Sequence, residues 1–154
     1  SGCVYIDDKI LKKDIDHPEN IGVLIENPNF WKRYTGMETL KLLADIRKQA
    51  TEDDIKNALV RVGLEPSDKR VVRKYSLGMR QKLGIAQAIM EKPDILLLDE
   101  PTNALDKKSV EQVRKIIHEE AERGAIVIIA SHNPQDIEGC SAILEMAEGR
   151  VCDE

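Results

Sequence analysis

The chain has 154 residues, of which 42% are hydrophobic and 33% are charged, so it is long enough for one domain with a real core and is not a disordered segment. Its net charge of −5 argues against a non-specific nucleic-acid binder; the basic stretch KRVVRK (69–74) is more simply a solvated approach to a helix. Three cysteines without a CxxC pair indicate a reducing cytosol, and the longest apolar run, AIVIIA (125–130), is far short of the ~20 residues of a membrane span, which argues against direct membrane insertion.

Short apolar segments predict β-strands near the start of the chain. VYI (4–6) and KILKK (9–13) are separated by Asp7 and Asp8 and predict a small hairpin at a sheet edge. IGVLIE (21–26) predicts a stronger strand, because its apolar run is longer and ends at Asn-Pro.

Three helices are predicted next, and they make the region 35–91 mainly helical. The stretches 35–49 and 51–63 each begin with a Thr that is followed three residues later by an acid, which is the spacing of a capping box. The two pairs are Thr35 with Glu38 and Thr51 with Asp54. A third helix is predicted from Ser76 to Met90, with Pro93 beyond its end. The apolar residues that share one face of it are Met79, Leu83, Ala86 and Met90.

The last third of the chain has a β-α-β order. Strands are predicted at 95–98 and 125–130, with an amphipathic helix at 107–123 between them. The buried side of that helix is expected to carry Val110, Val113, Ile117 and Ala121. Both strands are apolar throughout, which predicts a parallel sheet covered on both faces. The tail 142–151 predicts a hairpin that turns at Glu148 and Gly149.

Polar side chains follow both predicted strands. Asp99 is placed where a carboxylate can hold Mg²⁺, and Glu100 is placed where it can polarise an attacking water. The plainer alternative is a buried strand that ends in acids at a turn. His132 follows the second strand and therefore lies at the same carboxyl edge, where ligands bind in open α/β sheets; the alternative is a polar loop residue.

The segment YSLGMRQ (75–81) opens the third helix. Ser76 is a candidate N-cap, and Gly78 lets an anion approach the free N–H groups at the positive helix end. A helix cap is the default interpretation, since the segment lacks the tandem glycines of a nucleotide-binding loop.

Taken together, these segments resemble one family. YSLGMRQKLGIAQAIMEKPDILLLDEPTNALD, followed by SHN, resembles the signature helix, Walker B strand, D-loop and switch histidine of an ATP-binding cassette (ABC) ATPase, and IGVLIENPNFW resembles its Q-loop region. The resemblance implies an α/β, P-loop NTPase-like (RecA-like) parallel sheet core with an inserted helical subdomain. Residues 1–31 and 92–154 would form the core portion, and 32–91 the helical signature subdomain.

The resemblance also implies a role for each matching residue. Asp99 would support Mg²⁺, Glu100 would be the general base, and His132 would sense the γ-phosphate of ATP. The residues implied to act in nucleotide binding, some of them across a dimer, are Ser76, Gly78, Glu26 and Asp106. The signature reads YSLGM in place of the usual LSGGQ, and Glu26 stands where a Gln is usual. Both variants resemble the bacitracin, lantibiotic and multidrug exporter subfamily.

The aromatic group FWKRY (30–34) has two interpretations. It is either a local hydrophobic cluster under a loop or, by analogy with the family, the patch that docks a permease.

The phosphate-binding motif G-x-x-x-x-G-K-[ST] does not occur, because none of the nine glycines is followed by Lys. The chain therefore resembles an ABC ATPase that begins just past Walker A, and alone it is expected to be inactive. The favoured hypothesis is a fragment of an exporter's ATPase subunit, acting with a transmembrane permease and a second ATPase subunit at the cytoplasmic face of the membrane. The alternatives are a non-catalytic module that donates its signature helix to a complete partner, and a soluble ABC ATPase of translation or DNA repair.

Overall fold

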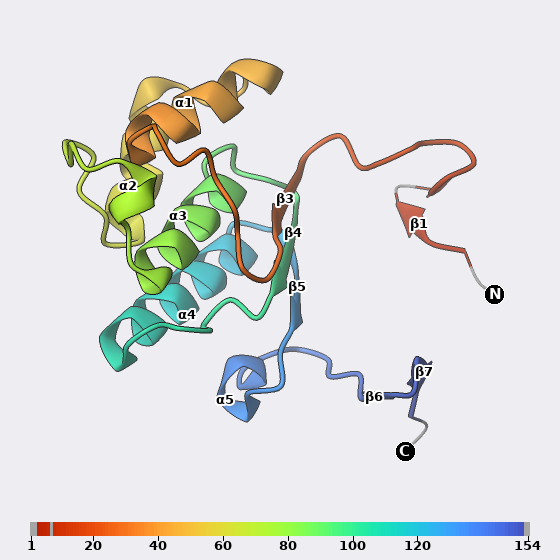
Figure 1. Ribbon diagram of the computed structural model, residues 1–154. Helices are drawn as coiled ribbons and strands as arrows, with labels where there is room; N and C mark the ends of the chain where they lie inside the picture. The colour runs from red at the N-terminus through yellow and green to blue at the C-terminus, as the bar shows by residue number, and fades with distance from the viewer. Residues whose placement is uncertain (1–2, 7, 153–154) are drawn as a thin grey trace.

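The computed structural model describes residues 3–6 and 8–152 (Figure 1). The elements in chain order are β1 (Tyr5–Ile6), β2 (Lys9–Ile10), β3 (Ile21–Leu24), α1 (Gly36–Arg47), α2 (Glu52–Arg61), the 3-10 turn η1 (Val72–Lys74), α3 (Leu77–Ile89), β4 (Ile95–Asp99), α4 (Lys107–Glu122), β5 (Ile126–Ala130), α5 (Pro134–Ile137), β6 (Met146–Ala147) and β7 (Arg150–Val151). Among the described residues, no helix combines the length and the apolar character that crossing a membrane requires.

A three-stranded parallel sheet forms the centre, in the order β3-β4-β5. Leu98 of β4 is paired with Leu24 of β3 on one side and with Ile129 of β5 on the other. Since the three strands run in the same direction, their carboxyl ends meet at one edge. The β-α-β order read from the sequence is confirmed.

The helices cover only one face of this sheet, so the expectation of a sheet covered on both faces is wrong for the described residues (Figure 1). Leu96 and Leu98 point toward the helices and are 1% and 3% exposed, whereas Ile126 and Ile128 of the other face are 62% and 56% exposed. The reason is that α3 packs on β3 and α4 packs on β5 from the same side. Strands that are apolar throughout therefore leave one apolar face open.

The close packing of α3 on β3 depends on Gly22. A Cβ atom at this position would lie 1.9 Å from the carbonyl oxygen of Ala88 in α3, a distance that no side chain tolerates. The strand and the helix can therefore approach each other backbone to backbone. The apolar core is continuous from Leu40 of α1 through Leu83 of α3 to Val113 of α4.

The helix starts agree with the sequence signals. Both predicted capping boxes are present, with the Thr35 hydroxyl accepting from the Glu38 N–H at 3.2 Å and the Thr51 hydroxyl accepting from the Asp54 N–H at 3.2 Å. Ser76 caps α3 by accepting from the Met79 N–H at 3.1 Å.

The buried stripe of α4 differs by one position from the prediction. Val113 is buried as expected, but Ala121 is exposed, and the buried residues of the final turns are Ile116 and Glu120. Positions three and four apart share a helix face, and Glu120 is buried because its carboxylate is paired. It accepts from Arg61 of α2 at 2.6 Å and from Arg123 at 2.9 Å.

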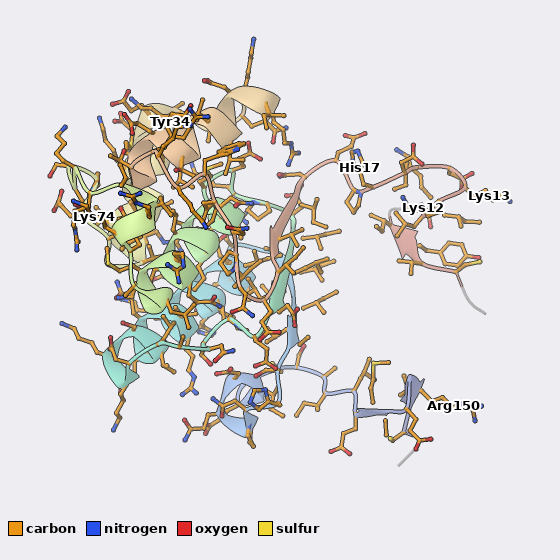
Figure 2. The ribbon with its side chains drawn as sticks, viewed as in Figure 1. Lys12, Lys13, His17, Tyr34, Lys74 and Arg150 are labelled. Carbon is orange, nitrogen blue, oxygen red and sulfur yellow. The ribbon has the colours of Figure 1, made fainter. Side chains whose placement is uncertain are left out.

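Two hairpins stand away from the helical body (Figure 1). The tail hairpin β6–β7 turns at Glu148 and Gly149, both with positive φ, as predicted. The first hairpin pairs Tyr5 with Ile10; Asp7, in its predicted turn, lies outside the described residues. This hairpin forms a two-stranded sheet of its own, so its predicted place at the edge of the main sheet is wrong. Figure 2 shows Lys12 and Arg150 far from the helices.

Candidate active site at the carboxyl edge of the sheet

The carboxyl ends of the three central strands bring together four of the residues predicted from the sequence. Glu26 follows β3, Asp99 ends β4, Glu100 comes next, and His132 follows β5. The Glu26 N–H lies 3.5 Å from Asp99 Oδ2, which links the ends of β3 and β4. The juxtaposition expected from the sequence is therefore present in the structure.

Glu100 and His132 form a direct pair. Glu100 Oε1 accepts from the His132 backbone N–H at 3.0 Å and lies 2.7 Å from His132 Nδ1. The hydrogen bond with the Glu100 carboxylate, together with its negative charge, raises the pKa of His132 above its ordinary value of 6.5. The Glu100 side chain is 18% exposed and the His132 side chain is 83% exposed. The carboxylate is therefore mostly covered, whereas the imidazole bonded to it faces solvent.

The backbone at Glu100 explains how this carboxylate leaves the strand. Its φ is +47°, in the left-handed region that non-glycine residues rarely adopt. The Glu100 N–H still bonds the carbonyl of Ala130 at 2.9 Å, so the sheet pairing continues while the side chain turns toward His132. Strained backbone of this kind clusters at functional sites.

A glutamine that sequence reasoning missed holds the turn after Glu100. Gln81 of α3 is buried, and its Nε2 donates to the carbonyls of Glu100 at 2.9 Å and Pro101 at 3.3 Å. Gln81 is the one polar residue among the buried positions of this helix. Gln81 thus ties the helix that follows the segment YSLGM to the turn that carries Glu100.

The acidic groups beside this pair suit a hard cation. Glu26 Oε1 accepts from Asn103 at 3.4 Å, so its carboxylate contacts the loop that follows β4, the strand that ends in Asp99. Among the described residues, no three His, Cys, Asp or Glu side chains are grouped tightly enough to enclose a metal ion. Two carboxylates without a full cage fit Mg²⁺, which keeps several waters and is usually shared with substrate phosphates.

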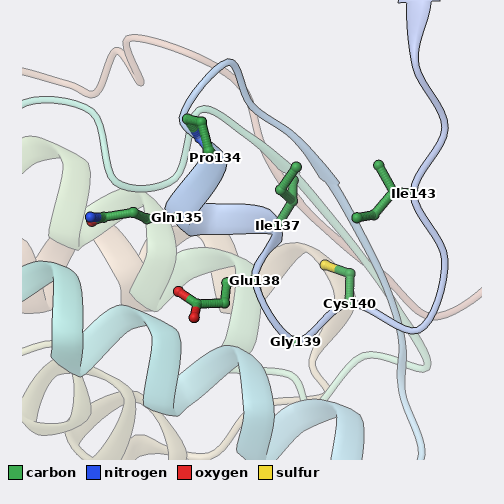
Figure 3. A pocket seen from close by; sticks show the side chains of 7 residues that line it. All are labelled: Pro134, Gln135, Ile137, Glu138, Gly139, Cys140 and Ile143. Carbon is green, nitrogen blue, oxygen red and sulfur yellow. The ribbon is translucent and has the colours of Figure 1, made fainter.

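A hollow of about 400 Å³ opens beside the pair. Its lining residues are Glu100, Thr102, Asn103, Ala104, His132, Asn133 and Pro134. A second hollow, of about 440 Å³, lies around α5 and shares only Pro134 with the first (Figure 3). The second is lined by Pro134, Gln135, Ile137, Glu138, Gly139, Cys140 and Ile143 and contains neither Glu100 nor His132. The first hollow is therefore the one that borders the Glu100–His132 pair.

The residues Ser76, Gly78 and Asp106 lie close to this turn but outside the pair. A Cβ atom on Gly78 would come within 3.0 Å of the Ala104 carbonyl, so the start of α3 packs directly on the loop after β4. Asp106 caps α4 by accepting from the Ser109 N–H at 3.0 Å, and this bond lowers the pKa of Asp106. Within the described part of the chain, no hydrogen bond joins Ser76 to Asp99, Glu100 or His132.

The aromatic group at 30–34 is divided between core and surface. Phe30 packs against the core, whereas Trp31 is 50% exposed and makes an edge contact with Tyr34 at 6.4 Å between ring centroids. The carbonyl of Tyr34 accepts from the Val72 N–H at 2.8 Å, which fixes the group beside η1.

Comparisons with known proteins identify the family. A family model described as "ABC transporter" matches residues 1–103. The chain is 48% identical over 151 residues to the uncharacterized ABC transporter ATP-binding protein YybJ of Bacillus subtilis, covering 97% of this chain and 69% of YybJ. It is 38% identical to the bacitracin transport ATP-binding protein BcrA of Enterococcus faecalis (87% of this chain, 44% of BcrA) and 37% identical to the lantibiotic transport ATP-binding protein SrtF of Streptococcus pyogenes (77% and 51%).

The fold has solved counterparts. The chain superposes with a TM-score of 0.75 on a dimeric post-hydrolysis state of the ATP-binding cassette MJ0796 bound to ADP and Pi, at 24% identity, covering 88% of this chain and 65% of that one. The α/β, P-loop NTPase-like fold inferred from the sequence is thereby confirmed. The chain belongs to the ABC transporter ATP-binding family, and its relatives include bacitracin and lantibiotic transport ATP-binding proteins.

Proposed function

We propose that this chain is part of the ATP-hydrolysing subunit of an ABC exporter whose cargo is a drug, a peptide antibiotic or a similar compound. The observation that carries the proposal is the Glu100 carboxylate, bonded to His132 at 2.7 Å beside Asp99 at the carboxyl edge of a parallel sheet. The nature of the cargo is supported by the bacitracin and lantibiotic transport proteins among the relatives.

The pair divides the work of hydrolysis. Glu100 accepts a proton from the water whose oxygen attacks the γ-phosphorus of ATP, the bond from that phosphorus to the bridging oxygen breaks, and ADP leaves. His132, through Nε2, donates to a γ-phosphate oxygen. Asp99 is the residue that would hold Mg²⁺, which supplies positive charge to the phosphates when bound, and Glu26 would contribute to nucleotide binding beside it.

The remaining predicted site residues act across a dimer in this proposal. By resemblance to the family, residues 1–31 and 92–154 would belong to the core portion, and 32–91 would be the helical subdomain that presents the signature turn. Ser76 is exposed at the positive end of the 13-residue helix α3, which suits contact with the nucleotide of a second ATPase subunit. Gly78 allows that helix end to sit on the loop leading to Asp106, which would carry the signal between subunits.

The proposed second partner is a transmembrane permease. Half-exposed Trp31 makes an edge contact with Tyr34, whose carbonyl accepts from the Val72 N–H of η1, and it offers an aromatic surface for a permease segment. The protein would then act in the cytoplasm, at the inner face of the cell membrane, and it would not require nucleic acid.

The experiment that tests this function replaces Glu100 in the full-length protein. Glu100→Gln keeps the shape of the side chain and removes the base, so ATP turnover should fall by about 100-fold or more while ATP binding is kept. Glu111→Gln, at an exposed position of α4, is the matched control and should turn over ATP like the wild type. Wild-type turnover in Glu100→Gln would exclude the proposed role.

The 154-residue chain by itself should neither bind Mg-ATP tightly nor hydrolyse it. Its sequence contains no G-x-x-x-x-G-K motif, and Asp99, Glu100 and Glu26 repel a triphosphate. A helix terminus contributes about 0.3–1 kcal/mol to anion binding, and a micromolar complex requires about 8 kcal/mol. Calorimetric titration and a phosphate-release assay check this expectation, and micromolar affinity or sustained turnover would show that the phosphate site has been placed wrongly.

A further inference from the structure

We infer that Asp136 is a positioning residue that holds the loop of His132 in register with Glu100. The inference rests on the proposed function, because it concerns the same catalytic pair. Asp136 lies in α5, four residues after His132, and neither the pair nor the proposed proton transfer uses it directly. Its role follows from its burial and from the origins of its three partners.

The Asp136 side chain is 1% exposed and gathers donors from three separate parts of the chain. Its Oδ2 accepts from the hydroxyl of Thr102 at 2.6 Å and from the hydroxyl of Ser131 at 3.0 Å. Its Oδ1 lies 3.3 Å from Arg114 Nη2 in α4. One buried carboxylate therefore bonds to three elements: the turn after β4, the loop after β5 and helix α4.

The Ser131 hydroxyl connects Asp136 with the Glu100–His132 pair. Besides its bond to Asp136, it accepts from the Asn133 N–H at 3.1 Å and lies 3.4 Å from Glu100 Oε2. The two neighbours of His132 in sequence are thus held by hydrogen bonds. Because the His132 ring is 83% exposed, apolar packing does little to hold it, and its place depends on this loop.

The contacts require a carboxylate and not only a side chain of that size. An ionised Asp accepts at both oxygens and donates at neither, which matches two hydroxyls on one side and a guanidinium on the other. In Asp136→Asn, the amide NH₂ either faces the Arg114 guanidinium, donor against donor, or faces the two hydroxyls, which must then accept from it. The substitution therefore removes the negative charge beside Arg114 and forces the bonds on one side to break or to reverse direction, with almost no change in volume.

The test changes the hydrogen-bond network of Asp136 at two different residues and adds one rescue variant. Asp136→Asn removes the charge, and Thr102→Val removes one hydroxyl and leaves the charge in place; Thr102→Ser restores the hydroxyl and serves as the rescue. In the 154-residue chain, hydrogen exchange of the His132 backbone N–H, which donates to Glu100, should be at least about tenfold faster in the first two variants and wild-type-like in the third.

In the full-length protein, kcat for ATP should fall by at least about tenfold in Asp136→Asn and Thr102→Val, with KM changed by less than about twofold, because the misplaced pair acts in the transition state. Leu59→Ala, in the distant helix α2, controls for loss of stability alone and should alter neither kcat nor His132 exchange. Unchanged His132 exchange in both network variants would overturn the inference, as would changes of equal size in Leu59→Ala.

The proposed function can fail separately. If the full-length wild type does not hydrolyse ATP, the proposed function is wrong, and the His132 exchange rates alone decide the role of Asp136. If it hydrolyses ATP and Asp136→Asn retains the wild-type kcat, the proposed function stands and the inference is wrong.

Discussion

Leu98 and Ile128 lie on neighbouring strands of the same sheet, yet the first is 3% exposed and the second is 56% exposed. Both are apolar, and both strands are apolar throughout. The difference arises because α3 and α4 lie on one face of the sheet (Figure 1). Leu98 is buried on that face, whereas Ile128 is exposed on the face without helices among the described residues. Residue type thus sets the tendency of a side chain to be buried, and the element that packs against it decides whether burial occurs.

The comparison extends to the candidate site. The helix-covered face fixes β4 through Leu96 and Leu98, and the turn that follows is further held by Gln81. The carboxylate of Glu100 is therefore delivered from the best-packed strand.

The largest expected effect is on stability and separates the two faces directly. Leu98→Ala leaves a cavity under the helices and should lower the free energy of unfolding by about 2–5 kcal/mol. Ile128→Ala, its matched control on the open face, should lower it by less than about 1 kcal/mol. Urea unfolding of both variants measures the difference. Equal losses would mean that the open face is covered in solution.

The sequence predicted those parts of the structure that depend on neighbouring residues. Both capping boxes, the β-α-β order and the tail turn at Glu148 and Gly149 follow from local signals, and each is present. The uncovered face of the sheet was not predictable. Apolar residues on both sides of a strand indicate that both faces are covered, but they do not show which part of the structure packs on each face.

The residues of the candidate site also fall into those that local sequence signals predicted and those that they did not. Asp99, Glu100 and His132 directly follow predicted strands, so the rule that ligands bind at the carboxyl edge was enough to place them together. Gln81 and Asp136 were missed because they act through contacts 19 and 34 residues away in the chain. No local pattern indicates such partners. The roles assigned to all these residues remain predictions.

A smaller effect is expected from making the open face polar. Ile126→Thr combined with Ile128→Thr keeps β-branched residues in β5 and removes exposed apolar surface, so the change in unfolding free energy should stay below about 1 kcal/mol. Self-association should decrease, because exposed apolar patches promote association. Sedimentation velocity over a range of concentrations measures this, and unchanged association would place the contact elsewhere.

The Glu100–His132 pair should contribute least to stability, and its hydrogen bond can be measured directly. The folded-state pKa of His132 is raised by Glu100, so the pair stabilises the fold fully below the unfolded value of 6.5 and loses this contribution as the pH rises through the folded-state pKa. An NMR titration of the His132 ring in the wild type and in Glu100→Gln measures the pairing without requiring activity.

We expect a His132 pKa above 6.5 in the wild-type chain, and a pKa that returns toward 6.5 in Glu100→Gln. Glu111→Gln, on the exposed side of α4, should leave the wild-type value unchanged. A His132 pKa that is the same in the wild type and in Glu100→Gln would show that the sheet does not bring the carboxylate and the imidazole together, and would contradict the catalytic pair on which the proposed function depends.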